Sequence, residues 1–151
     1  MKLATALSER AELQRKLSEL GNRLNNNAKV QDGEAPAEDP QALLTELDGA
    51  LARLEELMAR INLTNSRTVS AEGVTVTELL AKRDCLKKRV QFMRSFLDSA
   101  SSKVDRYSKT EIRVVSTVDV PALQKQVDAA SKALRETDEK LQELNWTTEL
   151  L

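Results

Sequence analysis

The sequence of 151 residues contains no histidine, and it contains one cysteine, Cys85. The missing histidine excludes catalytic triads and dyads that need an imidazole base, and it excludes zinc sites with histidine ligands. It also excludes the Glu-x-x-His di-iron centre of ferritin-like bundles. A single cysteine cannot form an intrachain disulfide or a thiolate zinc cage, which fits a reducing compartment. We therefore expect no metal centre and no cofactor.

Long apolar runs are also missing. None approaches the roughly 20 residues that a helix needs to cross a bilayer. Charge returns at Glu9, too early for the apolar stretch of a signal peptide. We therefore expect a soluble cytoplasmic protein with no membrane partner.

Glycine, proline and aromatic residues are scarce, whereas charged residues make up 31% of the chain. This composition is typical of long helices with a heptad pattern. Apolar residues recur at alternating spacings of three and four and predict helices over about residues 2–24, 40–64, 77–104 and 120–145. An aspartate and a nearby proline mark the start of the second and the fourth predicted helix: Asp39 with Pro40, and Asp119 with Pro121. The predicted core series are Leu3, Ala6, Arg10, Leu13, Leu17, Leu20 and Leu24; Leu44, Leu47, Leu51, Leu54, Met58 and Ile61, with Leu43, Ala50 and Leu57 flanking them; Leu79, Arg83, Leu86, Val90, Met93, Leu97, Ala100 and Val104; and Leu123, Val127, Ala130, Leu134, Thr137, Leu141 and Leu144.

The predicted fold is mainly α, a single helical domain over residues 1–151. Two arrangements bury the four apolar faces: an antiparallel bundle, or two coiled-coil-like helical hairpins that complete their cores by association. The helical period stops after Asn62. Alternating β-branched residues over about 67–76 predict a small β-hairpin, and Ile112–Val115 indicate one short strand over about 111–116.

Two arginines, Arg10 and Arg83, occupy core positions of their heptads. In an up-down-up-down bundle they would share a layer that faces Asp138. A buried arginine is costly unless it is paired. The pattern predicts a polar layer that sets the helix register, with an anion site as the functional alternative.

A second apolar stripe follows the outer side of the third predicted helix. Cys85 and Phe92 lie one heptad apart, with Phe96 beside them. Because another set of residues already fills the core seam of this helix, the stripe indicates an interface. Exposed strand edges also favour pairing between chains. We expect a homo-oligomer with two-fold symmetry.

Charge alternates along the chain: residues 1–30 and 79–113 are net basic, whereas 31–60 and 119–151 are net acidic. The favoured interpretation is electrostatic matching within each pair of helices. The alternative is a basic partner surface for nucleic acid on the third helix and the following loop. A carboxylate-bound metal enzyme is a third and weaker alternative, because the acidic positions are mostly outward in the heptads. The candidate residues of the basic partner surface are Lys103, Arg106, Tyr107, Lys109 and Arg113.

Several loop stretches resemble a known family. They are Asn25–Glu34 with Pro36–Pro40, Asp105–Ile112, Thr117–Val120 and Asn145–Thr148. Together they resemble small bacterial proteins of unknown function, some of which carry the label septicolysin. The resemblance implies an oligomeric, mostly helical protein with no established activity, and it supplies no catalytic residues. The label itself implies a thiol-activated pore-forming toxin, but this sequence lacks the Trp-rich, Cys-containing membrane-binding stretch of such toxins. The sequence therefore predicts a non-enzymatic, self-associating helical scaffold or adaptor.

Overall fold

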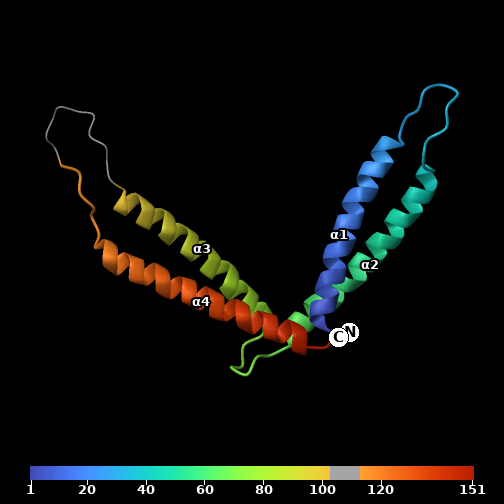
Figure 1. The fold of residues 1–151 in the computed structure, drawn as a ribbon. Coiled ribbons are helices and arrows are strands. Elements are labelled where there is room, and N and C mark those ends of the chain that lie inside the picture. Colours follow the sequence, from blue (N-terminus) through green and yellow to red (C-terminus); the bar gives the residue numbers. More distant parts are fainter. Residues whose placement is uncertain (103–112) are drawn as a thin grey trace. The chain divides into compact units, whose positions relative to one another are not determined.

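A computed structural model describes residues 1–102 and 113–151. Within these residues it contains four α-helices: α1 (Leu3–Asn26), α2 (Pro40–Arg67), α3 (Val76–Ser101) and α4 (Val120–Thr147) (Figure 1). Their limits lie close to those predicted, and the prediction of a mainly α fold is confirmed.

Two helices begin where short acidic side chains can accept backbone hydrogen bonds. Asp39 precedes α2 and accepts a 3.1 Å hydrogen bond from the amide of Gln41, while Pro40 occupies the first helical position. Asp119 precedes α4 and accepts a 3.1 Å hydrogen bond from the amide of Ala122. Each contact satisfies an amide that has no partner inside its helix.

The end of α1 is held by Asn27, which is 9% exposed. Its side-chain amide donates to the carbonyl of Arg23 at 2.8 Å, and its side-chain oxygen accepts from the amide of Glu38 at 3.0 Å. The guanidinium of Arg23 in turn donates to the Glu38 carboxylate. These contacts join the two ends of the loop that connects α1 and α2.

The chain divides into two compact units. The first contains residues 1–76 and 143–151, and the second contains residues 77–142. In the first unit α1 and α2 lie side by side and antiparallel, and in the second α3 and α4 do the same (Figure 1). Each unit is thus built on one helical hairpin.

The first unit is closed by residues from both ends of the chain. Lys2 and Glu149 form an antiparallel β-bridge. The amide of Leu3 donates to Thr148 at 2.9 Å, and that of Leu150 donates to Met1 at 2.8 Å. Leu150 is 7% exposed. One core cluster forms here, from Leu3, Ala6, Leu57, Ile61 and Leu150, and a second forms farther along the hairpin, from Leu20, Leu43 and Ala50.

The core prediction for α2 was wrong in part. Leu44, Leu51 and Met58 were placed in the core seam, but they are 40%, 46% and 45% exposed. Three of the residues buried in their place were predicted only as a flank: Leu43, Ala50 and Leu57, which are 3%, 6% and 0% exposed. The apolar face of α2 is wider than one neighbouring helix can cover, and α1 covers this side of it.

The seams of the second unit follow the predicted positions. Leu79 and Val90 are buried on α3. The buried residues of α4 are Leu123, Val127, Ala130, Thr137 and Leu141.

The described residues do not support the predicted β-hairpin or the predicted strand. Arg67 still belongs to α2, and residues 68–75 form a turn with one bridge, between Val69 and Thr75. Gly73 has a φ of +79°, which suits glycine, and its amide donates to Ser70 at 2.9 Å. Residues 113–116 contain no strand, and residues 111 and 112 lie outside the described part of the chain. β-Branched residues predicted strands here, but no neighbouring strand among the described residues extends the pairing.

Candidate self-association surfaces

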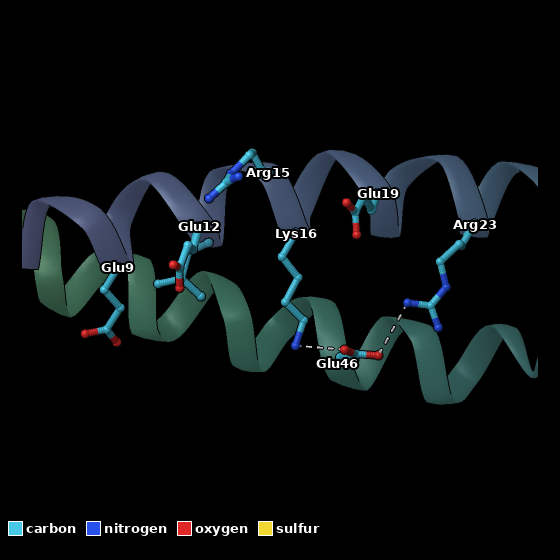
Figure 2. A pocket seen from close by; sticks show the side chains of 8 residues that line it. Glu9, Glu12, Arg15, Lys16, Glu19, Arg23 and Glu46 are labelled. Atoms are coloured by element: carbon cyan, nitrogen blue, oxygen red, sulfur yellow. Dashed lines mark ion pairs between the residues drawn. The ribbon is translucent and has the colours of Figure 1, made fainter.

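The groove beside α1 is lined almost entirely by charged side chains and has a volume of about 550 Å³. Figure 2 shows Lys16 and Arg23 on α1 pointing toward Glu46 on α2, at 2.8 and 3.9 Å. The hydrogen bond from Lys16 lowers the pKa of Glu46, and that from Arg23 lowers the pKa of Glu38. The pair between Lys16 and Glu46 joins basic α1 to acidic α2, as electrostatic matching within a hairpin predicts, while the pair between Arg23 and Glu38 joins α1 to the loop before α2.

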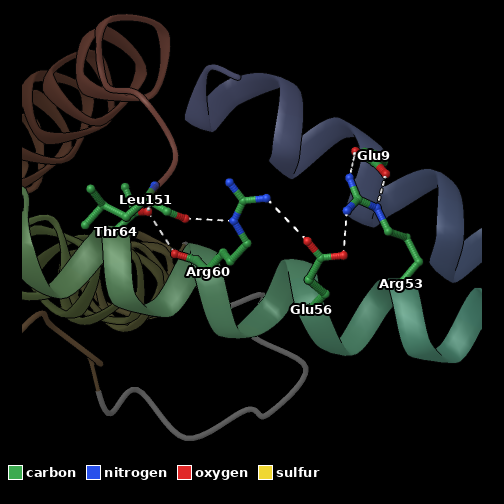
Figure 3. Close-up of polar contacts among 6 residues, drawn as sticks. All are labelled: Glu9, Arg53, Glu56, Arg60, Thr64 and Leu151. Carbon is green, nitrogen blue, oxygen red and sulfur yellow. Dashed lines mark hydrogen bonds and ion pairs between the residues drawn. The ribbon is translucent and has the colours of Figure 1, made fainter.

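A row of polar contacts follows α2 toward the C-terminal residues (Figure 3). The guanidinium of Arg53 donates to Glu9 on α1 and to Glu56, each at 2.7 Å. Arg60 donates to the carbonyl oxygen of Leu151 at 2.7 Å. The hydroxyl of Thr64 accepts from the amide of Leu151 at 3.0 Å. The row therefore connects α1, α2 and the C-terminal residues within the first unit.

This row predicts that stability falls in acid. Hydrogen bonds from Arg53 lower the pKa of both Glu9 and Glu56 below their ordinary value of 4.5. The unfolded chain therefore binds more protons than the folded one as the pH falls through that value. We expect the stabilisation to be complete above pH 4.5 and to be lost as the pH falls through the lowered pKa values.

Thermal unfolding measured by circular dichroism at a series of pH values checks this prediction. Arg53→Met should flatten the decline in melting temperature between neutral and acidic pH. Lys125→Met, which removes an exposed cation from α4, is the control and should leave the decline unchanged. An Arg53→Met profile parallel to that of the wild type would contradict the prediction.

The outer side of α3 carries the apolar stripe that the sequence singled out. We define the α3 stripe as Cys85, Phe92 and Phe96. Phe92 is 75% exposed and Phe96 is 50% exposed, and they are the two phenylalanines of the chain. Cys85 is exposed and is a free thiol. Because Leu79 and Val90 occupy the buried side of α3, the stripe is a separate apolar face.

The exposed apolar surface continues beyond the end of α3. Phe96 lines a hollow of about 230 Å³ at the end of α3. The other residues that line it are Ser99, Ala100, Ser102 and residues 114–117. Val114 and Val115, across this hollow, are 65% and 63% exposed. An exposed apolar region of this kind marks an interaction site more often than four scattered side chains would.

A second exposed apolar row lies on α2, where the sequence predicted core. We define the α2 stripe as Leu44, Leu51 and Met58, which are spaced seven residues apart. Sequence reasoning missed this surface because the three residues fit a heptad seam. Their heptad spacing was assigned to the core seam of the hairpin itself.

The two arginines predicted for a polar layer lie in different compact units, Arg10 in the first and Arg83 in the second. Both are half-buried, and the Nε atom of Arg10 has no hydrogen-bond partner within the described structure. Arg83 donates to Asp84 at 3.0 Å and lies 4.0 Å from Asp138 on α4. The contact between Arg83 and Asp138 joins α3 to α4.

The predicted basic partner surface lies mostly outside the described residues. Lys103, Arg106, Tyr107 and Lys109 belong to the undescribed range 103–112, whereas Arg113 is exposed. Over residues 1–102 and 113–151, no group of three or more acidic or cysteine side chains could hold a metal ion. None of the helices described here is both long and apolar enough to cross a membrane.

Comparison with known proteins identifies the family of this chain but indicates no activity. The structure is similar to the crystal structure of a functionally unknown conserved protein from Corynebacterium diphtheriae, with a TM-score of 0.92 and 44% sequence identity. The match covers 100% of this chain and 99% of the other. No curated protein matches the sequence. The sequence profile of DUF6847, a family of unknown function, matches residues 10–150. The match spans nearly the whole chain, and the protein therefore belongs to the family DUF6847.

Proposed function

We propose that this protein is a non-enzymatic, self-associating helical scaffold of the cytoplasm. The observation that carries the proposal is the exposure of both phenylalanines, Phe92 and Phe96, on one face of α3. Burying an aromatic side chain is among the most favourable contributions to an interface. The α2 stripe gives further support, since it is a second apolar row that the hairpin leaves uncovered.

Self-association predicts a concentration-dependent mass that depends on the α3 stripe. We expect light scattering after size exclusion to show an oligomer. Replacing Phe92 and Phe96 with glutamine should weaken association at least about tenfold, because two aromatic anchors are lost from the contact. Glutamine is a good helix former, so α3 itself should be retained.

The matched control is Val30→Gln, which changes a 47% exposed apolar residue in the loop between α1 and α2. It should associate like the wild type. A wild type that is monomeric at every concentration, or a double variant that associates normally, would refute the proposal.

The second candidate is a nucleic-acid-associated protein, favoured by the exposed cations of α3. Lys82, Lys87, Lys88 and Arg89 are all exposed, and none of them pairs with an acidic group among the described residues. Phosphate contacts make such binding strongly salt-dependent. Retention on a DNA column that falls steeply with added salt would support this candidate.

A further inference from the structure

The α2 stripe and the α3 stripe belong to different compact units and have similar dimensions. At 1.5 Å per residue, the α2 stripe extends about 21 Å from Leu44 to Met58, and the α3 stripe extends about 17 Å from Cys85 to Phe96. Neither stripe is covered by the described residues of its own unit, because α1 packs on the side of α2 that carries Leu43, and α3 buries the side that carries Val90. Each stripe therefore offers an apolar row of comparable length to a helix from elsewhere.

Acidic groups border the α2 stripe. Asp48 and Glu55 are both exposed, are seven residues apart, and each lies one helical turn from a leucine of the stripe. Neither forms an ion pair with any described residue, whereas Glu46 and Glu56 on the same helix pair with Lys16 and Arg53. The acidic side chains of α2 thus form two groups: those that pair with cations inside the hairpin, and those that border the α2 stripe.

Basic groups border the α3 stripe with the same spacing. Lys82 and Arg89 are exposed, are also seven residues apart, and flank Cys85 and Phe92 on the helix. The structure shows no acidic partner for either of them within residues 1–102 and 113–151. An apolar row with charges of one sign repeated every heptad along its edge is the pattern by which coiled-coil helices select partners.

We propose that two copies of this chain associate by packing the α2 stripe of one copy against the α3 stripe of the other. This inference rests on the proposed self-association and names the surfaces that make it. Because each copy carries both stripes, the contact can occur twice in a two-fold symmetric dimer. The apolar rows supply the contact, while Asp48 and Glu55 face Lys82 and Arg89 along its edge.

The charges favour contact between an α2 stripe and an α3 stripe over contact between two α2 stripes or between two α3 stripes. Two α2 stripes would bring Asp48 and Glu55 against the same acids of the other copy. Two α3 stripes would bring Lys82 and Arg89 against the same cations. Like charges brought together at an interface oppose association and suppress the wrong partner. The unlike pairing is the one in which every one of these four groups faces an opposite charge.

Two charge-reversed variants test the proposal. In the first variant, Asp48→Lys with Glu55→Lys, basic residues border both stripes. In the second, Lys82→Glu with Arg89→Glu, acidic residues border both stripes. Each variant alone should associate at least about tenfold more weakly than the wild type, because like charges now meet at both contacts. An equimolar mixture should recover association as a heterodimer, since every contact in it again joins opposite charges. A chain that carries all four substitutions should also recover it.

The controls reverse equal numbers of charges at the same spacing on the other two helices. They are Glu12→Lys with Glu19→Lys on α1, and Lys125→Glu with Lys132→Glu on α4, all at exposed positions. Both controls should associate like the wild type. Analytical ultracentrifugation gives the dissociation constants, and circular dichroism establishes that each variant is folded.

The outcomes separate the two proposals. A wild type that stays monomeric refutes self-association and, with it, this pairing. A wild type that associates while the single-stripe reversals have no effect, or while their mixture does not recover association, refutes the pairing alone. Weakened association of each variant together with recovery in the mixture supports it.

Discussion

Replacing Leu43 with alanine should lower the free energy of unfolding by about 2–4 kcal/mol, the range for removing a buried leucine side chain. Leu43 is 3% exposed and belongs to a core cluster with Leu20 and Ala50. The substitution removes apolar contacts and leaves a cavity at the point where α2 packs against α1. Alanine keeps the helix propensity high, so the loss reports on packing alone.

The adjacent residue provides the matched control. Leu44 is 40% exposed and lies on the same helix. Leu44→Ala should cost about 0.5 kcal/mol or less when unfolding is measured on dilute, monomeric protein, as for most surface substitutions. Urea denaturation followed by circular dichroism gives both values. Equal losses at the two positions, or a larger loss at Leu44, would show that the wrong side of α2 has been identified as core.

A loss of about 2–4 kcal/mol is also expected for Leu150→Ala. Leu150 is 7% exposed and packs with Leu3, Leu57 and Ile61. This single side chain therefore supports the cluster in which α1, α2 and the C-terminal residues meet. The two backbone contacts nearby, from Leu3 to Thr148 and from Leu150 to Met1, do not involve the side chain and should persist in the variant.

Leu151→Ala is the matched control for this prediction. Its side chain is 51% exposed, while its backbone amide and carbonyl bond to Thr64 and Arg60. Because alanine retains those backbone groups, the control should change the free energy of unfolding by about 0.5 kcal/mol or less. The same denaturation measurement applies. A Leu150→Ala variant as stable as Leu151→Ala would mean that the C-terminal residues do not contribute to the core.

Much of the fold could be predicted because its signals are local. Asp39 and Asp119 accept hydrogen bonds from amides two and three residues later, so the starts of α2 and α4 are readable from a few adjacent residues. The heptad positions of α4 also identify its buried side, because that helix has one apolar stripe. The same local signals did not predict the turn at 68–75. Its β-branched residues indicated strands, but such residues form strands only where a partner strand is present.

The candidate surfaces were predictable only in part. The α3 stripe was visible because Phe92 lies away from the seam residues of its helix, although its role as an interface stays a prediction. The α2 stripe was not recognised, because Leu44, Leu51 and Met58 form a heptad seam as regular as the one that is buried. Periodicity shows that a helix has an apolar side, but it does not show which of two adjacent seams a neighbour covers.

By itself the sequence determined the approximate limits of α1 to α4 and the side-chain caps that begin α2 and α4, and it excluded histidine chemistry. Only the tertiary structure decided which side of α2 meets α1 and how the chain divides into two compact units. The physical reason is that helix formation depends on groups within a few residues of one another. Coverage of an apolar face depends on the rotation of a whole helix about its axis, and a rotation of about 100° exchanges the seam of Leu43 for that of Leu44.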